Sequence, residues 1–339
     1  MTAARPDRPV RPARPAGPVR ESRPSVSVVI AAYSADRWTQ LRDAVASVVA
    51  QHRPAIETIV VVDHNPELLD RARRELTDAV VIPNAGQRGA SGARNTGVAR
   101  THGEVVAFLD DDACATPQWL ATMTVHFADP AVAGVGGRVD PLWATARPSW
   151  FPGEFDWTVG ASYSGMPETT AQVRNVWSNN MALRRAAFDA AGGFREDFGK
   201  VGVTSRPEDT ELCLRVNTGS WLYEPTSAVA HWVPAQRATL RYFLRRCYDE
   251  GKGKAEIAVM DGAVSGTSAE RWYTVRVLPG AVGRGLREAA TGDRSGALRS
   301  AAIVGGFGVA AAGFAIGCLK AALRRATPRA VAPEPAVTR

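Results

Sequence analysis

Three consecutive carboxylates, Asp110, Asp111 and Asp112, follow directly after an apolar run at residues 105–109. Like charges at such close range repel one another, so this cluster gains nothing from folding by itself. A divalent cation would neutralise it, and carboxylate oxygens are ligands that suit Mg²⁺ or Mn²⁺, which usually bridge to substrate phosphates. A solvated acidic turn is the alternative, and the rest of the sequence has to decide between the two.

Further residues of the same chemical types occur later in the chain. Glu208 and Asp209 follow a proline at the start of an expected helix, where acids can simply complement the helix dipole. His231 lies in AVAHWVP after a short apolar run. It is either a core histidine or a nitrogen ligand for the same cation.

These side chains have to be positioned by the elements before them. Short apolar runs at 26–32, 58–62, 79–82 and 105–109 alternate with segments of helical spacing, and this order predicts an α/β fold with a mostly parallel sheet flanked by helices. Ligands bind beyond the carboxyl ends of the strands in such sheets. Tyr33, Asp63 and the triple Asp all fall at such ends.

The segment 84–97, NAGQRGASGARNTG, is rich in small residues. Its glycines do not have the spacing of the dinucleotide fingerprint, and the next strand ends in acids. The small residues allow close backbone approach, and Arg88 and Arg94 are candidate partners for an anion. Its place between Asp63 and the triple Asp makes it a candidate nucleotide-binding loop.

The chain has 339 residues, 45% of them hydrophobic, and a formal net charge of +7. Much of the positive excess comes from arginines that alternate with prolines in residues 1–24, a segment that we expect to be disordered. The charge therefore does not indicate a nucleic-acid partner. No apolar stretch follows these arginines, so the segment is not a signal peptide.

In order, the motifs SVVIAAY, IVVVD, GARNTGVARTHGEVVAFLDDDA, WSNNMALRRAAFDAAGGFRE and PEDTELCLR resemble the family 2 glycosyltransferases with a GT-A fold, which is Rossmann-like. The resemblance covers roughly residues 25–235. The aromatic segment PLWATARPSWFPGEFDWTVG also looks like that of glucosyl-dolichyl-phosphate glucuronosyltransferases.

The resemblance implies how the donor and the metal are bound. Asp63 would contact the uracil or ribose of a UDP-sugar, and Tyr33 would line the base pocket. Asp110 and Asp112 would form the DxD motif, in which Asp112 binds the Mn²⁺ or Mg²⁺ ion, while Asp111 supports the loop. The second strand departs from the common ending DDxS, because Asp63 is followed by His and Asn.

It also implies the catalytic base. Asp209 would remove the proton of the acceptor hydroxyl, and His231 matches a histidine that coordinates the metal in some relatives. An inverting transfer needs such a carboxylate and a cation that stabilises the departing diphosphate. A sugar nucleotidyltransferase and a catalytically silent glycan-binding module are the alternatives.

Near the C-terminus, residues 301–319 contain no charged residue, and basic residues flank them. Nineteen such residues can span a bilayer, although a buried or interfacial hairpin would have the same composition. We expect membrane attachment at the cytoplasmic face of the cell membrane and an acceptor that is a lipid-linked glycan or cell-envelope polysaccharide. The expected division is a tail at 1–24, a glycosyltransferase domain at 25–240, a helical extension at 241–298, a membrane-associated helix at 299–325 and a tail at 326–339.

Overall fold

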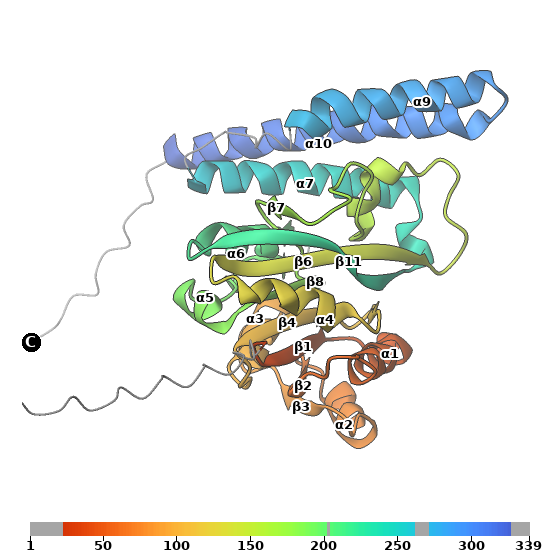
Figure 1. Ribbon diagram of the computed structural model, residues 1–339. Coiled ribbons are helices and arrows are strands. Elements are labelled where there is room, and N and C mark those ends of the chain that lie inside the picture. Colours follow the sequence, from red (N-terminus) through yellow and green to blue (C-terminus); the bar gives the residue numbers. More distant parts are fainter. Residues whose placement is uncertain (1–22, 202–203, 262–270, 327–339) are drawn as a thin grey trace, which may run out of the picture.

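The computed structural model describes residues 23–201, 204–261 and 271–326 (Figure 1). The two tails expected to be disordered lie almost wholly outside these ranges. Within them, a nine-stranded sheet forms the centre of the molecule, and a separate hairpin precedes α6. The strands of the sheet are β1 Val26–Ala32, β2 Glu57–Val62, β3 Val80–Pro83, β4 Val105–Asp110, β5 Ala113–Ala115, β6 Val132–Trp143, β7 Ala171–Val173, β8 Asn180–Arg184 and β11 Ser220–Val233; the hairpin is β9 Gly199–Val201 and β10 Thr204–Arg206.

Helices connect and cover these strands. The α-helices are α1 Trp38–Val49, α2 Pro66–Glu75, α3 Ala90–Val98, α4 Trp119–Thr124, α5 Arg185–Ala190, α6 Glu208–Arg215, α7 Leu240–Asp261, α9 Leu278–Ala290 and α10 Arg294–Ala326. Short helical turns are η1 Ala35–Arg37, η2 Val125–Ala128, η3 Gly153–Val159, η4 Ala235–Arg237 and η5 Tyr273–Val277.

The four strands expected from the apolar runs are present and mutually parallel, in the order β3-β2-β1-β4. Side chains of β1 alternate between two cores: Val28 and Ile30 pack with α1 and α2, whereas Val29 packs with α3. Gly97 of α3 lies so close to Val29 that a Cβ atom there would clash with its methyl group. Burial on both faces explains why these strands are continuous apolar runs in the sequence.

The sheet continues from β4 in the order β8-β6-β11-β5, and here the strand directions are mixed. β8 is antiparallel to both β4 and β6, whereas β6 and β11 run parallel. The antiparallel pair of β11 with β5 places His231 opposite Ala113, the residue that follows the triple Asp. The second half of the sheet thus brings the late histidine back to the end of β4.

The C-terminal helices form a layer beyond β7 and β11, at the end of the molecule opposite α2 (Figure 1). α10 packs along α7, and α9 folds back on α10 (Figure 1). η3 connects this layer with the rest of the core, because Phe155 packs against Phe243 of α7 with their ring centroids 5.3 Å apart. Within residues 241–298, the described residues are helical except for the turn at 291–293 between α9 and α10.

Candidate functional site

The carboxyl ends of β1, β2 and β4 meet at one edge of the sheet. β1 runs parallel to both neighbours, with Ala31 opposite Asp110 and Ala32 opposite Val62. Tyr33 and Asp63 are therefore the first residues beyond β1 and β2, while Asp110 is the last residue of β4. The structure brings these three candidate residues to the edge where α/β sheets bind ligands.

A cleft of about 540 Å³ opens beside Tyr33 and Asp63. Its other lining residues are His64, Asn65, Pro66, Glu67 and Arg88. The ring of Tyr33 is half exposed, and the guanidinium carbon of Arg37 lies 4.9 Å from its centroid. An exposed aromatic ring beside a carboxylate is a suitable surface for a flat heterocycle with N–H donors.

Asp63 also holds the glycine-rich segment in place. Its Oδ2 accepts a hydrogen bond from the backbone N–H of Gly89 at 2.9 Å, and its Oδ1 accepts one from Asn84 at 2.6 Å. Nδ1 of His64 lies 2.9 Å from the same Oδ1. The carboxylate of Asp63 therefore sets the position of the loop that follows β3, in addition to facing the cleft.

Asp110, Asp112 and His231 form a cluster of potential metal ligands. One ligand atom from each lies within 4.8 Å of the other two. Nε2 of His231 lies 3.2 Å from Oδ1 of Asp112, and the backbone N–H of Trp232 donates to the carbonyl of Asp112 at 2.8 Å. Asp112 and His231 are buried, whereas Asp110 is partly exposed at the mouth of the cluster. Two carboxylates and an imidazole suit Mn²⁺ or Mg²⁺.

Two buried atoms test whether the cluster fits a metal ion. Among the described residues, Nδ1 of His231 and Oδ1 of Asn179 have no hydrogen-bond partner. Their side chains both adjoin Gly160, at a backbone φ of +80° that favours glycine. A histidine that binds metal through Nε2 carries its proton on Nδ1 and usually donates it to an oxygen. The unpartnered Nδ1 of His231 can carry this proton and leave Nε2 to bind a cation, so the residues present fit a metal.

Arg37 neutralises the inner part of the cluster. Its Nη1 lies 2.8 Å from Oδ1 of Asp111 and 2.9 Å from Oδ2 of Asp112. The pKa of Asp111 is raised to about 7, mainly by burial. The charges of Asp112 and Asp110 also raise this pKa, whereas the charge and hydrogen bond of Arg37 lower it. Burial also acts to raise the pKa of Asp112, but the hydrogen bond and charge of His231, with Arg37, lower it overall. Asp112 is thus held as the carboxylate.

Arg94 connects the metal cluster with the start of α6. The side chain is buried, and it donates to Asp110 at 2.8 Å and to Glu208 at 3.3 Å. Burial acts to lower the pKa of Arg94, but Asp110 and Glu208 outweigh it and raise the pKa overall. Arg94 therefore lies at the site, and its guanidinium is shared between two carboxylates.

Asp209 follows Glu208 in the first turn of α6. Burial raises the pKa of its carboxyl to about 7, and the adjacent charge of Glu208 adds to the shift. The backbone N–H of Thr210 and the charge of Arg94 oppose it. As a whole residue, Asp209 is partly exposed. A carboxyl group with a pKa near 7 is suited to accept a proton at neutral pH.

The sequence did not identify two of the groups that complete this site. Nothing in the sequence marks Arg37 as a site residue beyond its place four residues after Tyr33. Glu208 was interpreted as an acidic residue at the start of a helix. Asn180 has a stronger signal, because it follows another asparagine at the start of β8. Its side chain bonds the carbonyls of Arg138 and Ser227 and the indole of Trp119, which joins four segments behind the metal cluster.

Comparison with known proteins gives a family for this site. The family model described as glycosyl transferase family 2 matches residues 27–192. A curated relative, the glucosyl-dolichyl phosphate glucuronosyltransferase of Haloferax volcanii, is 33% identical over 237 residues. The aligned region covers 68% of this chain and 76% of the relative.

Two solved structures are similar in fold. The mannosyltransferase PcManGT from Pyrobaculum calidifontis, in complex with GDP-Man and Mn²⁺, superposes with a TM-score of 0.54, covering 88% of this chain and 87% of that one at 17% identity. GalNAc-T7, with UDP, GalNAc and Mn²⁺, gives a TM-score of 0.50 and 19% identity, covering 63% of this chain and 44% of that one. At these identities the likeness concerns the fold, and it confirms the GT-A fold expected from the sequence.

Proposed function

The chain belongs to glycosyl transferase family 2, and from this premise we propose that it transfers a sugar, with inversion, from a UDP-sugar to a hydroxyl group with the help of a divalent metal ion. Membership of the family makes it a glycosyltransferase. Family membership does not favour the two alternatives, a sugar nucleotidyltransferase and a catalytically silent glycan-binding module.

One observation carries this proposal: Asp110, Asp112 and His231 converge beside Arg94, which in turn contacts Glu208 next to Asp209. A group of metal ligands and a carboxyl with a pKa near 7 are thus joined through one buried guanidinium. An inverting transfer needs both parts, one for the leaving diphosphate and the other for the attacking hydroxyl.

The residues divide the reaction between them. Tyr33 and Asp63 bind the uracil and ribose of the donor in the cleft. Asp110, Asp112 and His231 would hold Mn²⁺ or Mg²⁺, which would supply positive charge that stabilises the leaving diphosphate. Both solved neighbours were determined with Mn²⁺.

Asp209 takes the proton of the acceptor hydroxyl as that oxygen bonds to the anomeric carbon. The bond from this carbon to the diphosphate oxygen breaks on the opposite side, and the nucleoside diphosphate leaves with the electron pair. Arg94 keeps Asp110 and the start of α6 at a fixed separation during the transfer.

We propose a lipid-linked or cell-envelope glycan as the acceptor and the cytoplasmic face of the membrane as the place of reaction. The name of the Haloferax relative describes a transfer to a glucosylated dolichyl phosphate. α10 is long and apolar enough to associate with a membrane. Nucleotide sugars are made in the cytoplasm, so a catalytic domain on that side would meet its donor.

Incubation of the purified protein with a panel of UDP- and GDP-sugars, Mn²⁺ and a lipid-linked acceptor tests the proposal. We expect release of UDP that depends on both metal and acceptor, together with an extended acceptor of inverted anomeric configuration. Release of GDP instead would disprove the proposal that the donor is a UDP-sugar. Formation of inorganic diphosphate from a nucleoside triphosphate would indicate a nucleotidyltransferase.

A further inference from the structure

In α10 the large apolar side chains face outward and small residues face the protein, whereas a surface helix of a water-soluble protein buries its large apolar side chains. Apart from Ile303, its buried positions among the described side chains hold small residues. They are Gly296, Ser300, Ala302, Gly306 and Gly313. Large apolar side chains face outward: Leu298, Val304, Phe307, Ile316, Leu319 and Leu323 are between 38% and 61% exposed. Such a face needs an apolar environment, because water-soluble proteins turn their large apolar side chains inward.

The small residues fix α10 lengthwise against α7. A Cβ atom at Gly313 would clash with the carbonyl oxygen of Tyr248, and one at Gly251 would clash with the carbonyl oxygen of Ala310. Further along, a Cβ atom at Gly317 would lie 2.6 Å from that of Ala255. The two backbones therefore approach each other closely over several turns, and α10 cannot tilt away from α7 without losing this packing.

α7 is too polar to accompany α10 through a bilayer. Nine of its 22 residues are charged: Arg241, Arg245, Arg246, Asp249, Glu250, Lys252, Lys254, Glu256 and Asp261. Charged side chains are costly in the hydrocarbon region and are rare there. Because α10 is held along α7, it fits a membrane in the plane of its surface rather than across it.

Charge around the apolar face indicates which membrane surface it fits. Residues 271–323 contain seven basic residues against two acidic ones, Glu288 and Asp293. Arg271 and Arg276, which precede α9, and Arg287 within it are exposed, and Trp272, the neighbour of Arg271 in the sequence, is 52% exposed. Arginine next to tryptophan is typical of the level of the lipid headgroups.

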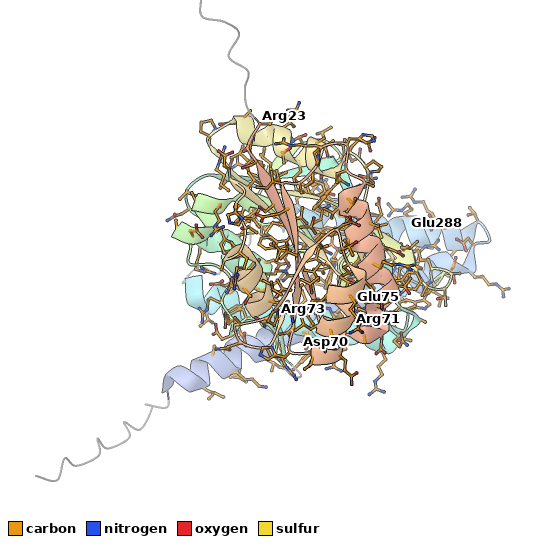
Figure 2. The ribbon with its side chains drawn as sticks, turned by 90° about the horizontal axis from the view of Figure 1, so that it is seen from below. Arg23, Asp70, Arg71, Arg73, Glu75 and Glu288 are labelled. Atoms are coloured by element: carbon orange, nitrogen blue, oxygen red, sulfur yellow. The ribbon has the colours of Figure 1, made fainter. Side chains whose placement is uncertain are left out.

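The opposite end of the molecule differs in character. Figure 2, seen from below, labels Asp70, Arg71, Arg73 and Glu75 of α2, a helix in which acidic and basic residues occur together. Arg71 and Glu75 form an ion pair at 3.0 Å. Exposed large apolar side chains are concentrated in the helical layer, since nine of the 16 among the described residues lie at 271–323.

We propose that the outer face of α10, together with α9, inserts into the surface of an anionic lipid bilayer and lies in its plane without crossing it. The inference deepens the proposed membrane location. It is tested by binding alone, so that its failure and a failure of the proposed transfer are distinguishable.

Flotation of the full chain with vesicles is the first test, using phosphatidylcholine with and without phosphatidylglycerol. We expect binding that anionic lipid strengthens and that high salt does not abolish. The double variant F307E/L319E should bind at least about tenfold more weakly, because two charges enter the apolar face. V49E/I56E is the matched control, since Val49 and Ile56 are 54% and 55% exposed elsewhere. Equal binding by all three proteins, or complete release by salt, would overturn the proposal.

The second test distinguishes lying in the plane from crossing. The full chain with a C-terminal epitope tag is added to sealed vesicles, and protease is then applied from outside. We expect complete loss of the tag, because both ends of α10 stay on the side of the catalytic domain. A protected tag would mean that α10 crosses the bilayer. If the protein forms a dimer in the absence of detergent and does not bind vesicles, a second copy covers the apolar face of α10. This result would also overturn the proposal.

Discussion

Arg94 and Glu208, 114 residues apart in the sequence, meet through a hydrogen bond of 3.3 Å, while Arg94 also bonds Asp110 at 2.8 Å. This contact couples α3 to the first turn of α6 across the end of β4. Movement of α6 away from the sheet would break this ion pair on the buried Arg94, which would keep Asp110 but lose Glu208. The metal cluster and the proposed base are therefore kept together before any substrate arrives.

Replacing Asp112 with Asn should remove metal-dependent transfer. The neutral amide loses the charge that binds the cation, and we expect metal affinity to fall by about 100-fold or more. Calorimetric titration with Mn²⁺ measures this directly. D140N is the control, because the side chain of Asp140 is 53% exposed and lies outside the cluster. Full activity of D112N in the presence of metal would contradict the assignment.

Replacing Asp209 with Asn should lower kcat by about 10²–10⁴-fold, the range expected for loss of a general base. Donor binding should stay near normal, because Asp209 lies apart from the cleft beside Tyr33. Parallel measurements of kcat and of the Kd for UDP separate the two effects. D189N, at a 57% exposed helical carboxylate, should behave as the wild type. Lost UDP binding in D209N would instead mark Asp209 as structural.

Transfer should depend on pH with an apparent midpoint of about 7. Burial, Glu208 and Glu250 raise the pKa of Asp209, against the opposing charge of Arg94 and the N–H of Thr210. The base works only when ionised, so activity is low below this pKa and rises as the pH passes through it. E208Q removes one like charge and should move the midpoint of kcat to lower pH. An unchanged or higher midpoint would count against Asp209 as the base.

Replacing Arg37 with Gln should destabilise the protein by about 3 kcal/mol, because the buried carboxylates of Asp111 and Asp112 lose their cationic partner. Bound Mn²⁺ should restore part of this loss, since the cation compensates the same carboxylates. Thermal unfolding with and without Mn²⁺ measures both effects. R42Q should cost less than about 0.5 kcal/mol, because Arg42 and Asp43 form an exposed pair at 3.8 Å. Equal losses in the two variants would contradict the prediction.

Alanine at two glycines of α10 should have opposite effects. G313A forces α10 away from Tyr248 and should cost about 1–3 kcal/mol. Gly308 faces open space, so G308A should stabilise the helix by about 0.5–1 kcal/mol. Chemical denaturation in one detergent, with both variants compared to the wild type, gives the two signs. If both variants are destabilised, the close packing against α7 does not explain why glycine is needed at position 313.

The first half of the fold could be predicted because its signals are local. Runs of apolar residues mark strands that are buried on both faces, and Asp63 and Asp110 mark where two of them end. The division of the triple Asp came from the family resemblance and stays a prediction: Asp110 and Asp112 lie with His231, whereas Arg37 contacts both Asp111 and Asp112.

The remaining features depend on contacts between distant segments. The antiparallel insertion of β8 between β4 and β6 leaves no local pattern in the sequence. The pairing of Arg94 with Glu208 could not be predicted from the sequence for the same reason, because it joins two distant segments. For α10, composition correctly indicated an apolar helix, but only its packing against α7 distinguishes the side that faces the protein from the side that faces outward.

One short segment joins the helical layer to the metal cluster. Phe155, in η3, lies beneath Gly306 of α10, and Gly160, five residues later, packs against the imidazole of His231, where a Cβ atom would come within 3.3 Å. A segment this short leaves little freedom in the height of the reaction centre above the outer helices. If those helices rest on a bilayer as proposed, this segment sets the distance between the lipid surface and the reaction centre.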